Sequence, residues 1–138
     1  MKSVSRVQSA EFSEKIDSYK DLLVWKKALS LVKTVYKVTQ EFPKDEMWSL
    51  TSQVKRAAVS IASNIAEGSS KRSTREFIRF LNMSYGSLSE LEAQLIIAHE
   101  LEFINKGDLD AVLIPANEIG KMLNGLIRSL NNKLNSEL

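Results

Sequence analysis

Residues 50–68 read LTSQVKRAAVSIASNIAEG, and this stretch decides the fold. Its apolar side chains recur every three or four positions, so an α-helix would gather them on one face. The members of that face are Leu50, Val54, Ala57, Ala58, Ile61 and Ile65. A file of polar residues borders the face, and we interpret it as hydrogen-bonding groups that fix register with neighbouring helices or subunits. This polar file is Gln53, Ser60, Asn64 and Glu67. Gly68 and the serines after it predict the end of the helix.

A second helical pattern precedes this stretch and covers residues 21–42. One set of apolar residues shares a side of that helix: Leu22, Trp25, Leu29, Val32 and Tyr36. A second set widens the apolar arc to about half the circumference, more than one packing seam requires. The second set is Val24, Leu31, Val35, Val38 and Phe42. Pro43 predicts the end of the helix.

Two more helices are predicted downstream. Ser73 and Glu76 fit a capping box at the start of a helix that continues to about residue 104. Its core stripe is Phe77, Phe80, Leu81, Ser84, Leu88, Leu91, Leu95 and Ala98. Asp108 is the predicted cap of a fourth helix, in which Pro115 predicts a kink or a delayed start. The apolar repeat of that helix is Leu109, Val112, Leu113, Ala116, Leu123, Ile127, Leu130 and Leu134.

No segment alternates between polar and apolar residues, so the sequence predicts no strand. Four long helices with short connections predict an all-α, antiparallel up-down-up-down four-helix bundle over residues 21–138. Residues 1–20 are polar, show no period and are predicted to be a tail. The sequence contains neither a secretory signal nor the run of about 20 apolar residues that a membrane span needs. We therefore expect a cytoplasmic protein.

The predicted third helix carries a second feature opposite its core stripe. Gly86, Ala93 and Ile97 lie on that side, together with Arg79 and Glu90. A glycine in mid-helix costs about 1 kcal/mol relative to alanine, and the close approach of another helix would explain it. The wide apolar arc of residues 21–42 agrees with this interpretation. We predict a homo-oligomer of bundles packed side by side, with Gly86, Ala93 and Ile97 at the subunit interface.

The composition excludes several kinds of catalytic site. Cysteine is absent, which rules out disulfides, thiolate metal sites and cysteine nucleophiles. His99 is the sole histidine, and Ile96 stands where a di-iron bundle would carry glutamate. We expect His99 to lie at a helix boundary, and we expect no enzyme activity, cofactor or metal. A ligand pocket lined by Arg56, Asn64 and Glu67 would revive the enzyme hypothesis.

Charge is unevenly distributed along the chain. Residues 20–79 hold twelve Lys/Arg and six Asp/Glu, a net +6, whereas residues 80–138 hold four and eight, a net −4. The segment GSSKRST at residues 68–74 places two cations before a helix N-terminus, which favours phosphate. A nucleic-acid phosphate surface is therefore predicted from Lys55, Arg56, Lys71, Arg72, Arg75 and Arg79. The alternative interpretation of this segment is an ordinary solvated turn.

The run SIASNIAEG at residues 60–68 resembles the signature of the four-helix-bundle proteins of bacterial 23S ribosomal RNA intervening sequences. Residues 42–43, 55–57 and 86–88 agree with that pattern, and the resemblance covers about residues 20–130. It implies an antiparallel bundle that assembles as a homopentamer. It also implies a relation to the accessory variability protein of diversity-generating retroelements, a basic pentamer that partners a reverse transcriptase and nucleic acid. The resemblance supplies no catalytic residues.

Two functions follow from the sequence, and neither is enzymatic or involves a membrane. The first is a homo-oligomeric bundle, pentameric by the resemblance, that binds RNA or DNA phosphates through the basic surface. The second is a protein–protein interaction scaffold that binds no nucleic acid. The modest overall charge of +2 and the acidic second half of the chain favour this second function.

Overall fold

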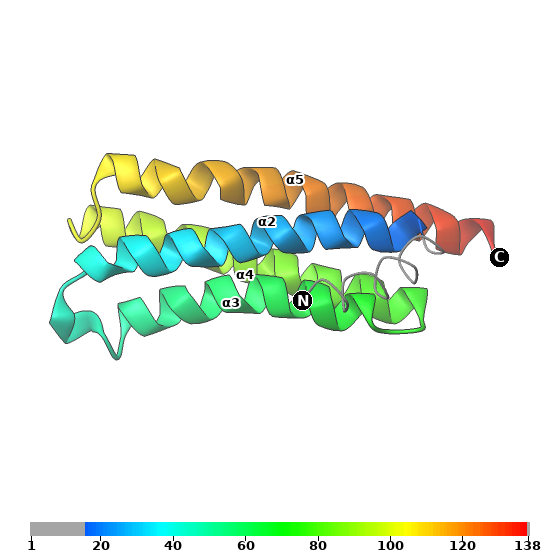
Figure 1. Ribbon diagram of the computed structural model, residues 1–138, viewed down its shortest axis with the longest axis horizontal. Coiled ribbons are helices and arrows are strands. Elements are labelled where there is room, and N and C mark those ends of the chain that lie inside the picture. The colour runs from blue at the N-terminus through cyan, green and yellow to red at the C-terminus, as the bar shows by residue number, and fades with distance from the viewer. Residues whose placement is uncertain (1–15, 138) are drawn as a thin grey trace, which may run out of the picture.

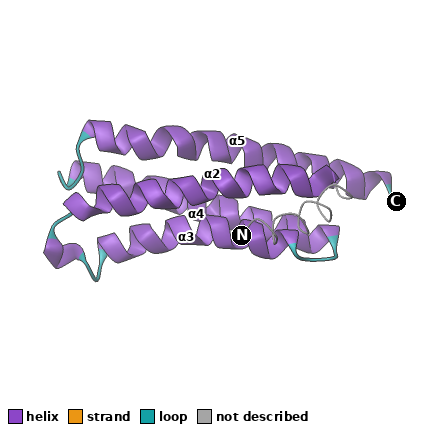
Figure 2. Ribbon diagram, viewed as in Figure 1, coloured by secondary structure: helices purple, strands orange, loops and turns teal. Residues whose placement is uncertain are grey.

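The structure is a computed structural model that describes residues 16–137, with side chains described for residues 23–137. Its four α-helices are α2 (Ile16–Val38), α3 (Leu50–Ser69), α4 (Thr74–Glu100) and α5 (Lys106–Ser136). Two short 3-10 turns, η1 (Thr39–Glu41) and η2 (Lys44–Glu46), connect α2 to α3. The described part of the chain contains no strand (Figure 2). The predicted all-α four-helix bundle is confirmed.

Each helix packs against two others around a single core. α3 contacts α2 and α4, while α5 contacts α4 and α2, so α2 and α4 lie diagonally across the bundle. Figure 1 shows the α2–α3 and α4–α5 connections at one end of the bundle and the α3–α4 turn at the other. The molecule is therefore elongated, and every long side of it is formed by two neighbouring helices.

The two apolar sets of α2 have different positions. The core contains the second set together with Ala28, whereas the described members of the first set, Trp25, Leu29, Val32 and Tyr36, lie at its border. Leu22 lies outside the residues whose side chains are described. Leu29 and Tyr36 are 36% and 43% exposed, and Trp25 and Val32 are half-buried. An apolar arc this wide exceeds the seam that two neighbouring helices can cover. The excess remains at the surface on the α3 side, where Lys55 of α3 lies 4.9 Å from the centre of the Tyr36 ring.

The ends of α2 differ from the sequence pattern. The helix begins at Ile16 and thus extends into the segment predicted as a tail, because Ile16 and Tyr19 continue the helical spacing upstream. The rest of that prediction, residues 1–15, lies outside the described residues. At the other end α2 stops at Val38, and Phe42 before Pro43 is extended, as proline requires of its predecessor.

The apolar face predicted for residues 50–68 lines the core, with Leu50 half-buried at its edge. The helix α3 ends at Ser69, within the predicted stop at residues 68–70, but no glycine in residues 16–137 has the positive φ of a glycine cap. Instead Gly68 is buried, and a Cβ added to it would lie 2.8 Å from the Cβ of Phe80 on α4. The close approach of the two helices is what requires glycine here.

The predicted caps are confirmed for α4 and wrong for α5. The Ser73 hydroxyl accepts a hydrogen bond from the Glu76 backbone N–H at 3.3 Å and begins α4. The N-cap of α5 is Asn105 rather than Asp108, since its side-chain oxygen accepts from the Asp108 N–H at 2.8 Å. The helix starts at Lys106, so Pro115 does not delay it. Pro115 lies inside the continuous helix, beyond the first turn, where it removes one backbone hydrogen bond.

Candidate functional site

The six predicted phosphate-binding residues fall into two groups. Lys71 and Arg72 belong to the α3–α4 turn, and Arg75 and Arg79 belong to the first two turns of α4. All four are exposed, and together they form what we call the turn cluster. Lys55 and Arg56 lie about 20 Å farther along α3, at a rise of about 1.5 Å per residue. The structure therefore brings together four of the six residues.

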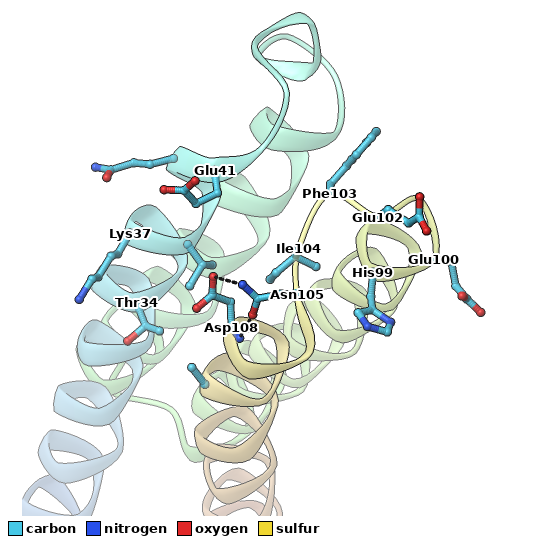
Figure 3. Close-up of a pocket in the computed structure, with 13 residues that line it drawn as sticks. Thr34, Lys37, Glu41, His99, Glu100, Glu102, Phe103, Ile104, Asn105 and Asp108 are labelled. Atoms are coloured by element: carbon cyan, nitrogen blue, oxygen red, sulfur yellow. Dashed lines mark hydrogen bonds between the residues drawn. The ribbon is translucent and has the colours of Figure 1, made fainter.

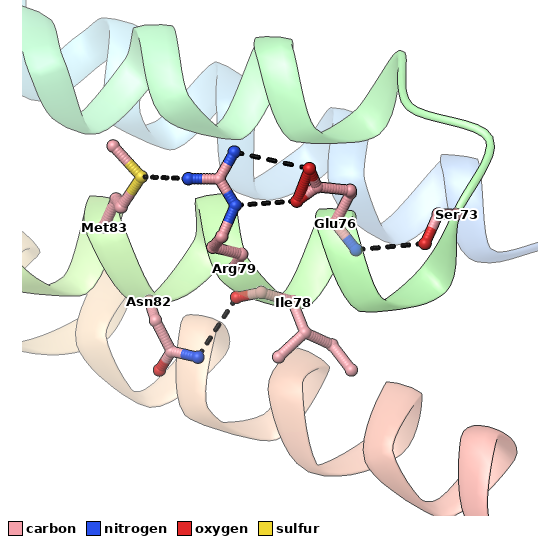
Figure 4. A network of polar contacts seen from close by, with 6 residues as sticks. All are labelled: Ser73, Glu76, Ile78, Arg79, Asn82 and Met83. Carbon is pink, nitrogen blue, oxygen red and sulfur yellow. Dashed lines mark hydrogen bonds and ion pairs between the residues drawn. The ribbon is translucent and has the colours of Figure 1, made fainter.

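Within the turn cluster, hydrogen bonds hold the Arg79 side chain in place (Figure 4). Its Nε donates to Glu76 Oε2 at 2.6 Å, and its Nη1 donates to Met83 Sδ at 3.7 Å. The hydrogen bond from Arg79 lowers the pKa of Glu76, and the same bond raises the pKa of Arg79. The Phe80 ring lies beneath both the Arg79 guanidinium, at 4.7 Å, and the Lys71 ammonium, at 5.3 Å.

The remaining cations of the turn cluster carry uncompensated charge. Within the part of the chain that the structure describes, neither Arg72 nor Arg75 forms an ion pair. Both are exposed at the N-terminal end of α4, where the helix dipole adds partial positive charge. Glu76 interacts electrostatically with both Arg79 and Lys71, which leaves the charges of Arg72 and Arg75 to attract anions.

The polar file of α3 contributes to packing between helices. Ser60 Oγ and Ser87 Oγ of α4 are 2.8 Å apart, and Asn64 Nδ2 donates to the Ser60 carbonyl at 2.9 Å. The predicted role in register is confirmed for Ser60, which links α3 to α4. Gln53 and Glu67 are exposed beyond this line. Sequence patterning missed a second link between these helices, in which the buried Ser84 hydroxyl donates to the Ile61 carbonyl at 2.8 Å.

The predicted interface residues of α4 all lie on its outward side. Gly86 and Ala93 are exposed, and Ile97 is 50% exposed. A Cβ added to Gly86 would meet no atom within 4 Å. Met83 and Glu90 lie on the same side at helical spacing. We call this surface the α4 outer face: Met83, Gly86, Glu90, Ala93 and Ile97.

A second exposed apolar surface lies between α2 and α3, and only its α2 part was visible in the sequence pattern. Trp48, in the turn before α3, is 88% exposed, and Met47 and Val59 are 50% and 40% exposed. They border a shallow depression of about 530 Å³ together with Tyr36 and Lys55. We call this surface the α2–α3 face: Leu29, Tyr36, Met47, Trp48, Lys55 and Val59. The turn residues escaped sequence analysis because they do not belong to a helical repeat.

A cleft lies at the end of the bundle where α2 ends and α4 connects to α5 (Figure 3). Its volume is about 940 Å³, and its walls carry the carboxylates of Glu41, Glu100 and Glu102. His99 lines it from the last turn of α4, the boundary position expected. The cleft does not include Arg56, Asn64 or Glu67, which the enzyme hypothesis would need. No group of three histidine or acidic residues within 16–137 is arranged to hold a metal ion.

The helices of residues 16–137 are either too short or too polar to cross a membrane.

The same fold occurs in a solved structure. A crystal structure of a protein from the S23 ribosomal protein family of Bacteroides thetaiotaomicron superposes with a TM-score of 0.73 at 24% sequence identity. The superposition covers 79% of this chain and 98% of that chain. Among curated proteins, none matches the sequence. The sequence profile of the 23S rRNA-intervening sequence protein family matches residues 20–125. Because that match spans most of the chain, the protein belongs to the 23S rRNA-intervening sequence protein family.

Proposed function

We propose that this protein is a non-enzymatic homo-oligomer, a pentamer by the family resemblance, that binds RNA or DNA phosphates through its turn cluster. The observation that carries the proposal is the grouping of Lys71, Arg72, Arg75 and Arg79 at one end of the bundle. Exposed guanidinium and ammonium groups at a helix N-terminus are the donors that phosphate oxygens accept from. Such contacts position a nucleic-acid backbone without reading its sequence.

Assembly would strengthen this binding by repetition. One turn cluster offers four cations, and Glu76 already engages one of them. In a ring of identical bundles every copy presents the cluster at the same height, so a single nucleic acid contacts several copies at once. The second contact is then intramolecular, which raises the overall affinity without any new kind of contact.

The test is a titration of fluorescently labelled single-stranded RNA and double-stranded DNA with the full chain at several salt concentrations. Binding through phosphates predicts affinity that falls steeply as salt rises. The double variant Arg72→Ala/Arg75→Ala should bind more weakly and reduce the slope of log affinity against log salt by about 0.7–0.9 per lost phosphate contact.

A matched control removes the same charge elsewhere. Lys26 and Lys33 are exposed on the outward side of α2, away from the turn cluster. The double variant Lys26→Ala/Lys33→Ala should therefore retain wild-type affinity and salt dependence. Equal weakening by both double variants would mean that net charge alone drives binding, and the turn cluster would lose its role.

A second control adds charge. Glu76→Gln frees Arg79, whereas Glu118→Gln frees Lys27, which pairs with Glu118 at 2.6 Å on the other side of the molecule. Only Glu76→Gln should increase nucleic-acid affinity. If the wild type binds neither RNA nor DNA at low salt, the phosphate-binding proposal fails and the protein-interaction scaffold becomes the better account.

A further inference from the structure

We propose that the α2–α3 face of one copy packs against the α4 outer face of the next, so that assembly is head-to-tail. The inference rests on the homo-oligomer of the proposed function, but it is independent of nucleic-acid binding. It assigns a partner to each of the two exposed apolar faces and explains an unusual glycine. The occupant of both faces is a second copy of this chain.

The position of a residue along the helix axes, its height, limits which residues can meet in a ring. Hydrogen bonds from Ser84 to Ile61 and between Ser60 and Ser87 align α3 with α4 in opposite directions. Counting outward from these contacts at the helical rise of about 1.5 Å, each residue of α3 has a partner of equal height on α4. Rotation about an axis parallel to the helices leaves heights unchanged. In a ring whose axis runs parallel to the helices, residues that meet therefore share a height.

Residues of equal height on the α2–α3 face and the α4 outer face are complementary. Two pairs share a height: Val59 with Gly86, and Lys55 with Glu90. Trp48 lies in the turn before α3, at the same end of the bundle as Ile97 of α4. Across the contact, Val59 of one copy would occupy the open space at Gly86 of the next. The Lys55 ammonium would meet the Glu90 carboxylate, and the indole of Trp48, 88% exposed in the single chain, would cover Ile97. The Val59 side chain, the Lys55 charge and the Trp48 ring would thus each contact a complementary residue.

The directions of the two faces also fit a ring. The α2–α3 face looks out between two helices, whereas the α4 outer face belongs to the helix diagonally opposite α2. The two faces are different surfaces that point in neither the same nor opposite directions. A contact between different surfaces is heterologous, and the series closes into a ring when the rotations of successive copies add up to a full turn.

The test breaks each face separately and measures mass by light scattering without nucleic acid. Gly86→Arg fills the open space on the α4 outer face, and Val59→Arg places a charge on the α2–α3 face. Each variant should be a folded monomer of 15.5 kDa. Mixed together, the two variants should form a heterodimer of twice that mass, because each retains the one intact face that the other lacks.

Gly125→Arg is the matched control for Gly86→Arg. Gly125 is also exposed in mid-helix with no atom within 4 Å of an added Cβ, but it lies on α5 outside both faces. This variant should assemble like the wild type. Thermal melts followed by circular dichroism verify that all three variants fold.

A charge exchange tests the pairing directly. Lys55→Glu and Glu90→Lys should each shift assembly toward monomer, and the double variant should restore it. The proposal is overturned if Gly86→Arg or Val59→Arg assembles like the wild type, or if the two monomeric variants do not pair on mixing. A self-complementary two-fold contact would produce that second result. Because Arg72 and Arg75 are unchanged throughout, failure of the head-to-tail contact is distinct from failure of phosphate binding.

Discussion

Two glycines in long helices, Gly68 and Gly86, have opposite surroundings. Gly68 is buried where α3 meets α4, and a Cβ there would approach the Phe80 Cβ to 2.8 Å and Phe77 Cδ1 to 3.0 Å. Gly86 lies on the outward side of α4, and a Cβ there would meet nothing within 4 Å. The first glycine is explained by packing inside one chain. The second has no explanation inside one chain, although a glycine in mid-helix costs about 1 kcal/mol relative to alanine.

Contacts within one chain therefore explain the glycine at position 68 but not the glycine at position 86. The contact around Gly68 aligns α3 with α4 and so places every outward residue of α4 at a defined height. The contact proposed at Gly86 uses that alignment, since the Ser84–Ile61 and Ser60–Ser87 hydrogen bonds help to place Val59 at the height of Gly86. Perturbing the inner contact should therefore reduce stability, and perturbing the outer face should affect assembly.

Gly68→Ala should have the largest effect on stability. The added methyl group would collide with the Cβ of Phe80, which cannot move without its helix, so α3 and α4 must separate locally. Overpacking of this kind costs about 1–3 kcal/mol, partly offset by about 1 kcal/mol of helix propensity. Urea unfolding should show a net loss of up to about 2 kcal/mol. A gain of about 1 kcal/mol, the effect of helix propensity alone, would show that the two helices do not require glycine at this contact.

Ser84→Ala should have the next largest effect. Its buried hydroxyl donates to the Ile61 carbonyl at 2.8 Å, and removal of such a bond costs about 1 kcal/mol. Ser89→Ala, an exposed substitution on the same helix, serves as the control and should change the free energy of unfolding very little. Equal values for the two variants would remove Ser84 from the alignment of α3 and α4.

Gly86→Ala separates helix propensity from assembly. In the Val59→Arg background, where the proposal predicts a monomer, the substitution should stabilise the protein by about 0.5–1 kcal/mol through propensity alone. Gly125→Ala in the same background should give the same gain, since both sites are open. A loss at Gly86 in the monomer would indicate an unrecognised contact within the chain and would weaken the comparison of the two glycines.

The smallest expected effect on stability comes from the ion pair between Arg79 and Glu76 near the start of α4. The hydrogen bond from Arg79 lowers the pKa of Glu76 below its ordinary value of 4.5. Because the pKa is lower in the folded state, the stabilisation is fully present above about pH 4.5 and is lost as the pH falls through the folded pKa. The difference in Tm between the wild type and Glu76→Gln should therefore be constant near neutral pH and vanish in acid. A difference that grows in acid would contradict the assigned sign.

Much of the fold could be predicted from the helical repeat. The buried faces of α3 and α4 follow from spacing alone, because a residue on a long helix has a fixed direction relative to its neighbours. Sequence patterning failed where direction depends on context. The arc of α2 was wide enough to offer two candidate sides, and only the positions of α3 and α5 decide which of them is buried. Asp108 and Asn105 were both capable caps, and backbone geometry selects Asn105.

The candidate surfaces were predictable to a lesser extent. The outward position of Gly86, Ala93 and Ile97 follows from the period of α4. The separation of Lys55 and Arg56 from the turn cluster follows from the length of α3. The helical pattern predicted that length, but a count of charges over a segment does not consider the distances between them. Trp48 could not be placed, because it lies in a turn with no repeat. Nor could its place at the same end of the bundle as Ile97, which depends on the arrangement of α3 and α4.

In the proposed assembly, the two exposed apolar faces meet in neighbouring copies of the chain. The most direct test is the solution mass of the wild-type chain, measured by light scattering across a dilution series without nucleic acid. The account predicts a single species of several times 15.5 kDa, five times by the family resemblance. A folded particle of 15.5 kDa at the highest soluble concentration would contradict it.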